Sequence, residues 1–128
     1  LALVRIRKSY AGHARKVAYG LWGMGQMMLE KTIIVCDEDC DVQNPAEVLW
    51  RVGNNVAPQR DVFFVWGPMD ALDHTAEYVR FGSKMGIDAT RKLPNEGQTQ
   101  PWPPDIVMDE EVRRRVDQLW DRLGIRLP

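Results

Sequence analysis

The chain has 128 residues, 45% of them hydrophobic and 27% charged, which is the composition of an ordinary globular domain. Its 17 Lys and Arg against 18 Asp and Glu give a formal net charge of −1, which argues against a nucleic-acid binder that neutralises phosphates in bulk. No apolar run approaches the roughly 20 residues that span a bilayer, and no signal-peptide pattern opens the chain. The two cysteines, Cys36 and Cys40, make no disulfide framework, so we expect a cytoplasmic protein.

Strand and helix patterns alternate in the first part of the chain. Residues 1–7 are typical of a strand that starts without a lead-in, so we expect the chain to be cut from something longer. A helix with a broad apolar face is predicted over residues 13–30, where three glycines indicate either a break near Gly23 or the close approach of another backbone. Residues 32–36 are a β-branched apolar run typical of a strand buried on both faces.

The second part of the chain begins with a well-marked helix. Asn44 is predicted as its N-cap and Pro45 as its first residue, and the helix is expected to stop near residues 53–55. A third strand is predicted over residues 61–66. Residues 67–108 are then expected to be a long loop region, and residues 109–124 a C-terminal helix that ends at a glycine.

These elements predict an α/β fold, with a small parallel Rossmann-like sheet flanked by helices, a long loop and a C-terminal helix. Strands that alternate with helices are connected in the right-handed sense and run parallel. Three strands leave exposed sheet edges, which indicates missing material or a partner. A loop as long as the one predicted is usually functional or packed against a partner.

The side chains that could carry chemistry form no complete catalytic motif. Residues 36–41 hold both cysteines and four acidic residues, but zinc is weakly supported without a second cysteine pair or a nearby histidine. A hard-metal site is an alternative, and a solvated turn with one buried cysteine is favoured. Structural roles are favoured for His13 and His74, and His13 suits an anion or hydrogen-bond contact better than a base. A basic cluster suits either a phosphate or an interface, and consists of Arg5, Arg7, Lys8, Arg15 and Lys16.

One stretch of the predicted loop has no helix or strand pattern that explains its make-up. It reads Gly-Ser-Lys-Met-Gly-Ile-Asp-Ala-Thr over residues 82–90, and it resembles the motif near the C-terminus of the UbiD-family decarboxylases. Three other segments agree with that family in order and spacing, so the resemblance covers nearly the whole chain. Residues 10–14 are similar to the family's Tyr-Pro-Gly-His-Ala turn, with Ala11 in place of proline. Residues 34–42 and 48–50 are similar to its strand, acidic turn and following helix. Residues 67–73 are similar to its Thr-Pro-Ile-Asp segment.

The resemblance implies that residues 1–128 are a single α/β domain, the C-terminal oligomerisation domain of a longer enzyme. The family catalyses reversible, non-oxidative decarboxylation of aromatic or α,β-unsaturated acids with prenylated flavin mononucleotide, a divalent metal that is usually Mn²⁺, and K⁺. Its catalytic set and metal ligands lie in the preceding flavin-binding domain, so no catalytic or metal residue is assigned here. The implied partners are that domain, further copies of the chain, the acid with its product CO₂, and a flavin prenyltransferase that supplies the cofactor.

A few residues match positions that line the substrate pocket in family members. Gly67, Pro68 and Met69 match a loop of the cavity, and Gly67 leaves space that predicts a larger substrate than cinnamate-like acids. Met28 matches a hydrophobic residue of the pocket wall, although its pattern alone favours a core position. Several members carry a basic residue that touches the flavin phosphate early in the preceding helix, and residues 21–25 supply none here.

Four further residues are predicted to serve the long loop or an interface: His13, Lys84, Asp88 and Arg91. No family motif gives the last three a role, and we expect them to hold the loop against a neighbouring domain or subunit. The apolar face of the C-terminal helix is likewise expected to dock on another chain or domain, through Val112, Val116, Leu119, Trp120 and Leu123.

Two other functions stand beside the enzyme domain. The first is a stand-alone accessory or assembly subunit without its own catalysis, which would be favoured if the reading frame began within a few residues of Leu1. The second is a nucleotide-binding enzyme of the Rossmann type, which is weakly supported because no Gly-x-Gly-x-x-Gly follows the first strand.

Overall fold

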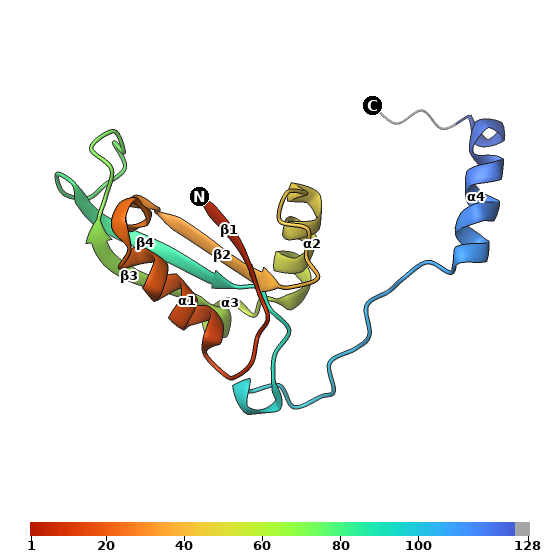
Figure 1. Cartoon of the computed structure of the whole chain (residues 1–128), viewed down its shortest axis with the longest axis horizontal. Coiled ribbons are helices and arrows are strands. Elements are labelled where there is room, and N and C mark those ends of the chain that lie inside the picture. The colour runs from red at the N-terminus through yellow and green to blue at the C-terminus, as the bar shows by residue number, and fades with distance from the viewer. Residues whose placement is uncertain (125–128) are drawn as a thin grey trace.

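Four strands form one mixed sheet in the computed structural model, which describes residues 1–124 (Figure 1). The sheet has the order β1-β2-β4-β3, and β2 pairs in parallel with both β1 and β4. The edge strand β3 runs antiparallel to β4. The strands are β1 (Ala2–Ile6), β2 (Thr32–Asp37), β3 (Val62–Pro68) and β4 (Phe81–Asp88). The predicted α/β class is therefore confirmed.

Two sequence-based expectations about this sheet are wrong. Residues 67–108 are not one loop, because residues 81–88 form β4, the strand between β2 and β3. The third strand is also not parallel, since residues 69–80 turn the chain straight back and adjacent strands joined in this way pair antiparallel. The strand was missed because Gly82, Lys84 and Gly86 occupy alternate positions where apolar side chains normally mark a strand.

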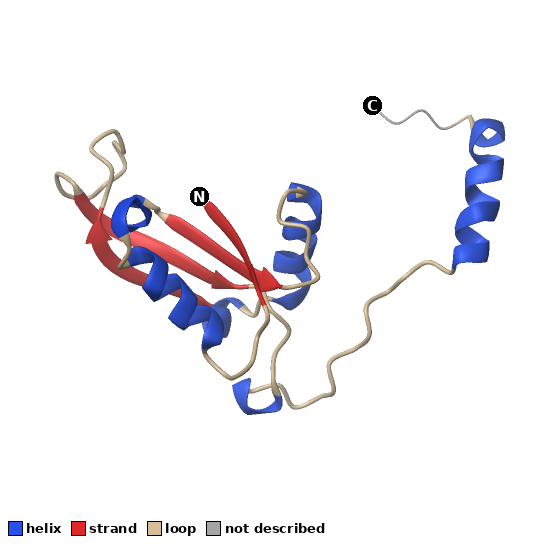
Figure 2. Ribbon diagram, in the orientation of Figure 1, coloured by secondary structure: helices blue, strands red, loops and turns tan. Residues whose placement is uncertain are grey.

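Helices cover the two faces of the sheet with separate apolar clusters (Figure 2). Helix α1 (His13–Trp22) packs on one face, where the buried side chains are Ala14, Ala18, Ile33, Val35 and Phe63. Helix α2 (Pro45–Asn55) packs on the other face, where they are Cys36, Cys40, Val48 and Ala89. Successive residues of β2 contribute to opposite clusters, which explains its unbroken apolar sequence.

Local signals fix the ends of these helices. Helix α1 ends at Trp22, with the predicted break at Gly23, and the 3-10 helix η1 (Gly25–Leu29) follows it. The Asn44 side chain caps α2 by accepting a hydrogen bond from the Ala46 N–H at 3.1 Å. A single turn, α3 (Pro58–Asp61), leads into β3.

The chain leaves the sheet through η2 (Pro94–Glu96) and an extended segment that ends in α4 (Glu110–Leu123). Asp109 caps α4 by accepting from the Glu111 N–H at 2.8 Å. Figure 1 shows α4 standing apart from the sheet, and its apolar residues Val112 and Leu123 are 51% and 55% exposed. None of the helices described in residues 1–124 is long and apolar enough to cross a bilayer.

The contact between Phe63 and Gly86 gives a test of this packing. The buried Phe63 ring occupies the place of a Cβ on Gly86, so we expect Gly86→Ala to lower the free energy of unfolding by about 1–3 kcal/mol. Gly20→Ala, in an open position of α1, is the matched control and should raise stability by up to about 1 kcal/mol. Denaturant unfolding of both variants measures the difference, and equal stabilities would contradict the packing.

Candidate functional site

Three of the four residues matched to the family's substrate pocket lie together in the structure. Met28 at the end of η1, Pro68 at the end of β3 and Met69 just after it line a hollow of about 330 Å³. Met69 is 2% exposed and Met28 39%, so the wall runs from the interior to an accessible surface. The other lining residues are Leu29, Asp70, Ala71 and Arg80. We call this cavity the methionine hollow.

Gly67 is buried in β3 but is not placed at the methionine hollow. A Cβ on Gly67 would lie 3.1 Å from Cε and 3.5 Å from Cδ of Lys84. The aliphatic stem of Lys84 therefore fills the space that was expected to admit a larger acid. The preference for larger substrates has no basis at Gly67.

Lys84 lies in β4 and is 2% exposed. Its ammonium group donates hydrogen bonds to the carbonyl oxygens of Met28 at 2.7 Å and Glu30 at 3.1 Å. Burial lowers the pKa of Lys84, although the negative charges of Glu30 and Asp73 oppose the shift. These bonds tie η1 to the sheet and fix the backbone that carries Met28, which is a contact within this domain.

Asp88 lies at the end of β4 in a buried group of opposite charges. Its carboxylate accepts from the Thr90 N–H at 3.0 Å and from Lys92 at 3.2 Å, and it lies 3.8 Å from the Lys8 ammonium. Lys92 also lies 3.6 Å from Asp61, and burial lowers the pKa of Lys92. We call Lys8, Asp61, Asp88 and Lys92 the buried ion cluster, and it joins β1, β3 and β4 where the parallel strands end.

Arg91 holds the segment after η2 against this domain. Its guanidinium donates to Asp39 and to Asp105, each at 2.6 Å, and its backbone N–H donates to Asp37 at 2.7 Å. Arg51 of α2 donates to the same Asp105 carboxylate at 3.2 Å. Although burial opposes the shift, the hydrogen bond from Arg91 lowers the pKa of Asp39. A loop contact was predicted for Arg91, and here that contact is with residue 105 of the same chain.

His13 begins α1 and stabilises the turn before it. Its ring stacks on Tyr10 with 4.4 Å between centroids, and its Nδ1 accepts from the Ser9 N–H at 3.3 Å. These contacts match the structural role favoured for His13. His74 is exposed in the segment between β3 and β4.

Cys36 at the end of β2 and Cys40 in the turn after it both lie in the interior. Among the residues described, no group of three or more His, Cys, Asp or Glu side chains could hold a metal ion. Cys36 and Cys40 are both buried and free. Burial, with the neighbouring Cys40, raises the pKa of the Cys36 thiol to about 12, so this group stays protonated at neutral pH.

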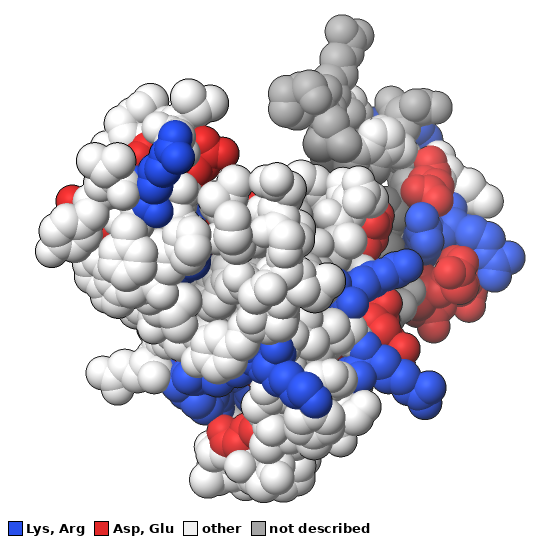
Figure 3. Space-filling view, turned by 60° about the vertical axis from the view of Figure 1, so that its left-hand side comes forward, with Lys and Arg blue, Asp and Glu red and all other residues white. Residues whose placement is uncertain are grey.

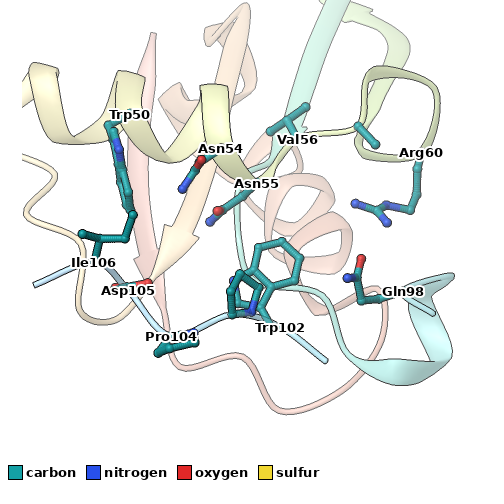
Figure 4. A pocket seen from close by; sticks show the side chains of 12 residues that line it. Trp50, Asn54, Asn55, Val56, Arg60, Gln98, Trp102, Pro104, Asp105 and Ile106 are labelled. Carbon is teal, nitrogen blue, oxygen red and sulfur yellow. The ribbon is translucent and has the colours of Figure 1, made fainter. Parts of the chain in front are cut away.

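A larger cavity of about 510 Å³ lies beside α2 (Figure 4). Trp50 and Asn54 extend from α2 toward the segment that carries Trp102 and Ile106, and Gln98 points toward Arg60. No sequence pattern predicts this cavity, because its walls come from segments far apart in the chain and the proline-rich segment has no periodicity. It shares no lining residue with the methionine hollow.

The family to which this α/β domain belongs is shown by a comparison with known protein families. Residues 1–89 match the family described as the 3-octaprenyl-4-hydroxybenzoate carboxy-lyase C-terminal domain. The chain therefore belongs to the UbiD C-terminal domain family.

Relatives of this chain are much longer proteins. An uncharacterized protein of Aquifex aeolicus is 57% identical over 122 residues, which cover 95% of this chain and 25% of that protein. An uncharacterized protein of Archaeoglobus fulgidus is 42% identical over 124 residues, covering 96% of this chain and 26% of that protein. The chain thus spans about a quarter of the length of these relatives.

Two solved structures contain the same fold within larger chains. The closed form of Sedimentibacter hydroxybenzoicus vanillic acid decarboxylase matches with a TM-score of 0.80 and 29% identity, over 91% of this chain and 26% of that one. The UbiD-class enzyme HmfF from Pelotomaculum thermopropionicum, in complex with FMN, matches with a TM-score of 0.64 and 29% identity, over 80% of this chain and 24% of that one.

Replacement of Lys84 tests its role in fixing the methionine hollow. Lys84→Met keeps the stem but leaves the Met28 carbonyl without a donor and the Glu30 carbonyl with the Trp22 indole N–H alone, so we expect a loss of about 1–3 kcal/mol in the free energy of unfolding. Lys16→Met removes an exposed ammonium group and should change stability by less than about 0.5 kcal/mol. Hydrogen exchange should also quicken over residues 25–30 in Lys84→Met alone, and unchanged protection there would contradict this role.

Proposed function

We propose that this domain belongs to an enzyme that decarboxylates an aromatic or α,β-unsaturated carboxylic acid, reversibly and without oxidation, with prenylated FMN. Within that enzyme the domain supplies one wall of the substrate pocket and contacts between subunits. The observation that carries the proposal is the meeting of Met28, Pro68 and Met69 in one hollow, because their separate matches to the family's pocket converge in space.

The methionine hollow has the chemistry of a wall for an aromatic ring. Burial of apolar surface contributes roughly 25 cal/mol per Å², and methionine side chains adapt to irregular flat ligands. Its volume of about 330 Å³ is at the small end of the range for ligand pockets. The hollow is thus suited to form part of a pocket that a facing domain completes.

The cofactors are assigned to the preceding domain. Among residues 1–124, no group of three or more His, Cys, Asp or Glu side chains is placed to hold a metal ion, and residues 21–25 hold no basic side chain for a flavin phosphate. We therefore propose that the main ligands of prenylated FMN, Mn²⁺ and K⁺ lie in the preceding domain. The chain's own residues bind and orient the acid's ring and keep water from one side of it.

Relatives about four times as long as this chain support the enzyme domain over a stand-alone accessory subunit. Two buried free thiols, Cys36 and Cys40, support a reducing cytoplasm as its location. A flavin prenyltransferase in the same compartment would then supply the cofactor.

Large uncharged surfaces support contacts with another domain and with further copies of the chain. Figure 3 shows a broad area without charged side chains across the middle of one face of the molecule, with Lys and Arg gathered below it. The apolar face of α4 is exposed at Val112 and Leu123. A homo-oligomer in which α4 docks on a neighbouring subunit would bury that face.

Activity of the full-length protein tests the proposed function. Co-expression with a flavin prenyltransferase should give a protein with flavin absorbance that releases CO₂ from at least one member of a panel of aromatic and α,β-unsaturated acids. Expression without the prenyltransferase is the control and should abolish turnover. A full-length protein with neither flavin absorbance nor turnover would refute the proposal.

The oligomer contact is tested by changes in α4. Truncation before Asp109 should lower the oligomeric state measured by light scattering, because it removes the exposed apolar face. Trp120→Asp should act in the same direction, since Trp120 lies on that face. Gln118→Asp, on the opposite side of the helix, is the matched control and should leave the mass unchanged. An unchanged mass after truncation would exclude this contact.

A further inference from the structure

We propose that Arg80 is a specificity-determining residue that recognises an anionic oxygen on the ring of the acid in the methionine hollow. This inference rests on the proposed function and adds the class of substrate. The oxygen is that of a phenolate or of a second carboxylate, at the part of the ring that faces this domain.

Arg80 stands in a backbone conformation that arginine rarely adopts. Its φ is +58°, and no other non-glycine residue within 1–124 has a positive φ. It belongs to a tight turn in which Tyr78 and Phe81 exchange hydrogen bonds at 3.0 and 3.1 Å. The third position of a turn with positive φ favours glycine or asparagine. An arginine here is explained by what its side chain does, since the turn itself would form more easily without it.

The backbone of Arg80 is fixed against the wall of the hollow. Its carbonyl oxygen accepts a hydrogen bond from the Met69 N–H at 3.0 Å. Arg80 lines the hollow together with Met28, Pro68 and Met69, and it also borders an adjoining hollow beside Asp73 and Glu77. The turn therefore places a cation beside an apolar surface that suits an aromatic ring.

The charge of Arg80 is free for a ligand, whereas the acidic groups of the same segment are engaged. Asp70, which also lines the hollow, accepts from the Leu72 N–H at 2.8 Å. Asp73 is paired with Lys31 at 2.8 Å, and Glu77 accepts from the Ser83 N–H at 2.9 Å. Across the described residues, the Arg80 guanidinium makes neither a hydrogen bond nor an ion pair with any of them.

The guanidinium has the geometry to recognise an oxygen anion. Its planar array of N–H donors binds carboxylate in a bidentate manner and holds its charge at every physiological pH. A ring that packs on Met28 and Pro68 would bring its substituent to Arg80. The carboxylate that is lost would then face the domain that holds the cofactor, so Arg80 selects substrate and takes no part in bond cleavage.

Binding of matched probes to the full-length holoenzyme tests this inference. The probes are terephthalate against its monomethyl ester, and 4-hydroxybenzoate against 4-methoxybenzoate, titrated by calorimetry. In one of the two pairs, we expect the wild type to bind the unmethylated acid at least tenfold more tightly than its methylated partner. A preference for terephthalate identifies a second carboxylate as the recognised group, and a preference for 4-hydroxybenzoate identifies a phenolate. Arg80→Gly should remove this preference, and Arg80→Lys should keep part of it.

The control measurements separate recognition from folding. Arg80→Gly should have an unchanged or higher Tm, because glycine adopts the positive φ without strain. Arg5→Gln, which removes an exposed arginine of β1, should leave both the preference and the Tm unchanged. Equal preferences in wild type and Arg80→Gly, or no binding of any probe to the wild type, would overturn the inference. Binding that depends on Arg80 without turnover of any acid would instead refute the proposed function alone.

Discussion

The ammonium group of Lys84 is buried between the sheet and η1, and the shape of the methionine hollow depends on it. The last carbonyl oxygens of a short 3-10 helix need donors from outside the helix when they are buried. Lys84 supplies one to Met28, and Lys84 and the Trp22 indole N–H both donate to Glu30 directly after the helix. Burial of a cation is costly unless its hydrogen bonds are satisfied, so the buried ammonium group of Lys84 in turn needs these carbonyl oxygens. Met28 lies at the hollow because the hydrogen bond from Lys84 holds η1 against β4.

The Gly-Ser-Lys-Met-Gly-Ile-Asp motif of residues 82–88 is explained by the burial of Lys84 at its centre. Alternate residues of a strand share a face, which places Gly82, Lys84, Gly86 and Asp88 on one buried side of β4. A Cβ at Gly86 would overlap the Phe63 ring, and one at Gly82 would overlap the Glu77 carboxylate. The glycines two residues before and after Lys84 thus leave room for the Glu77 side chain and the Phe63 ring. The motif describes packing on a strand, although its composition is that of a functional loop.

Local signals predicted the elements that depend on local chemistry. The Asn44 cap, the break at Gly23 and the start of α4 after Asp109 all lie where side chains or glycines mark them. The order of the sheet depends on contacts between distant residues, and a strand with glycine and lysine on its buried face lacks the pattern that reveals strands. Only the family resemblance predicts that Met28 lies near Pro68 and Met69. No sequence pattern predicts a role for Arg80, because the φ angle of a turn residue cannot be read from composition.

The fixed exit of the chain explains why α4 lies apart from the sheet. Arg51 and Arg91 hold Asp105 at the end of β2, so the residues that follow leave the domain from a defined point. An isolated helix of 14 residues is only marginally stable in water, and most of the stability of an amphipathic helix comes from burial of its apolar face. Figure 1 shows no part of the sheet or its helices covering that face. We infer that the helical state of residues 110–123 depends on a surface outside this domain, so that the folding of this segment and its docking on that surface are one process.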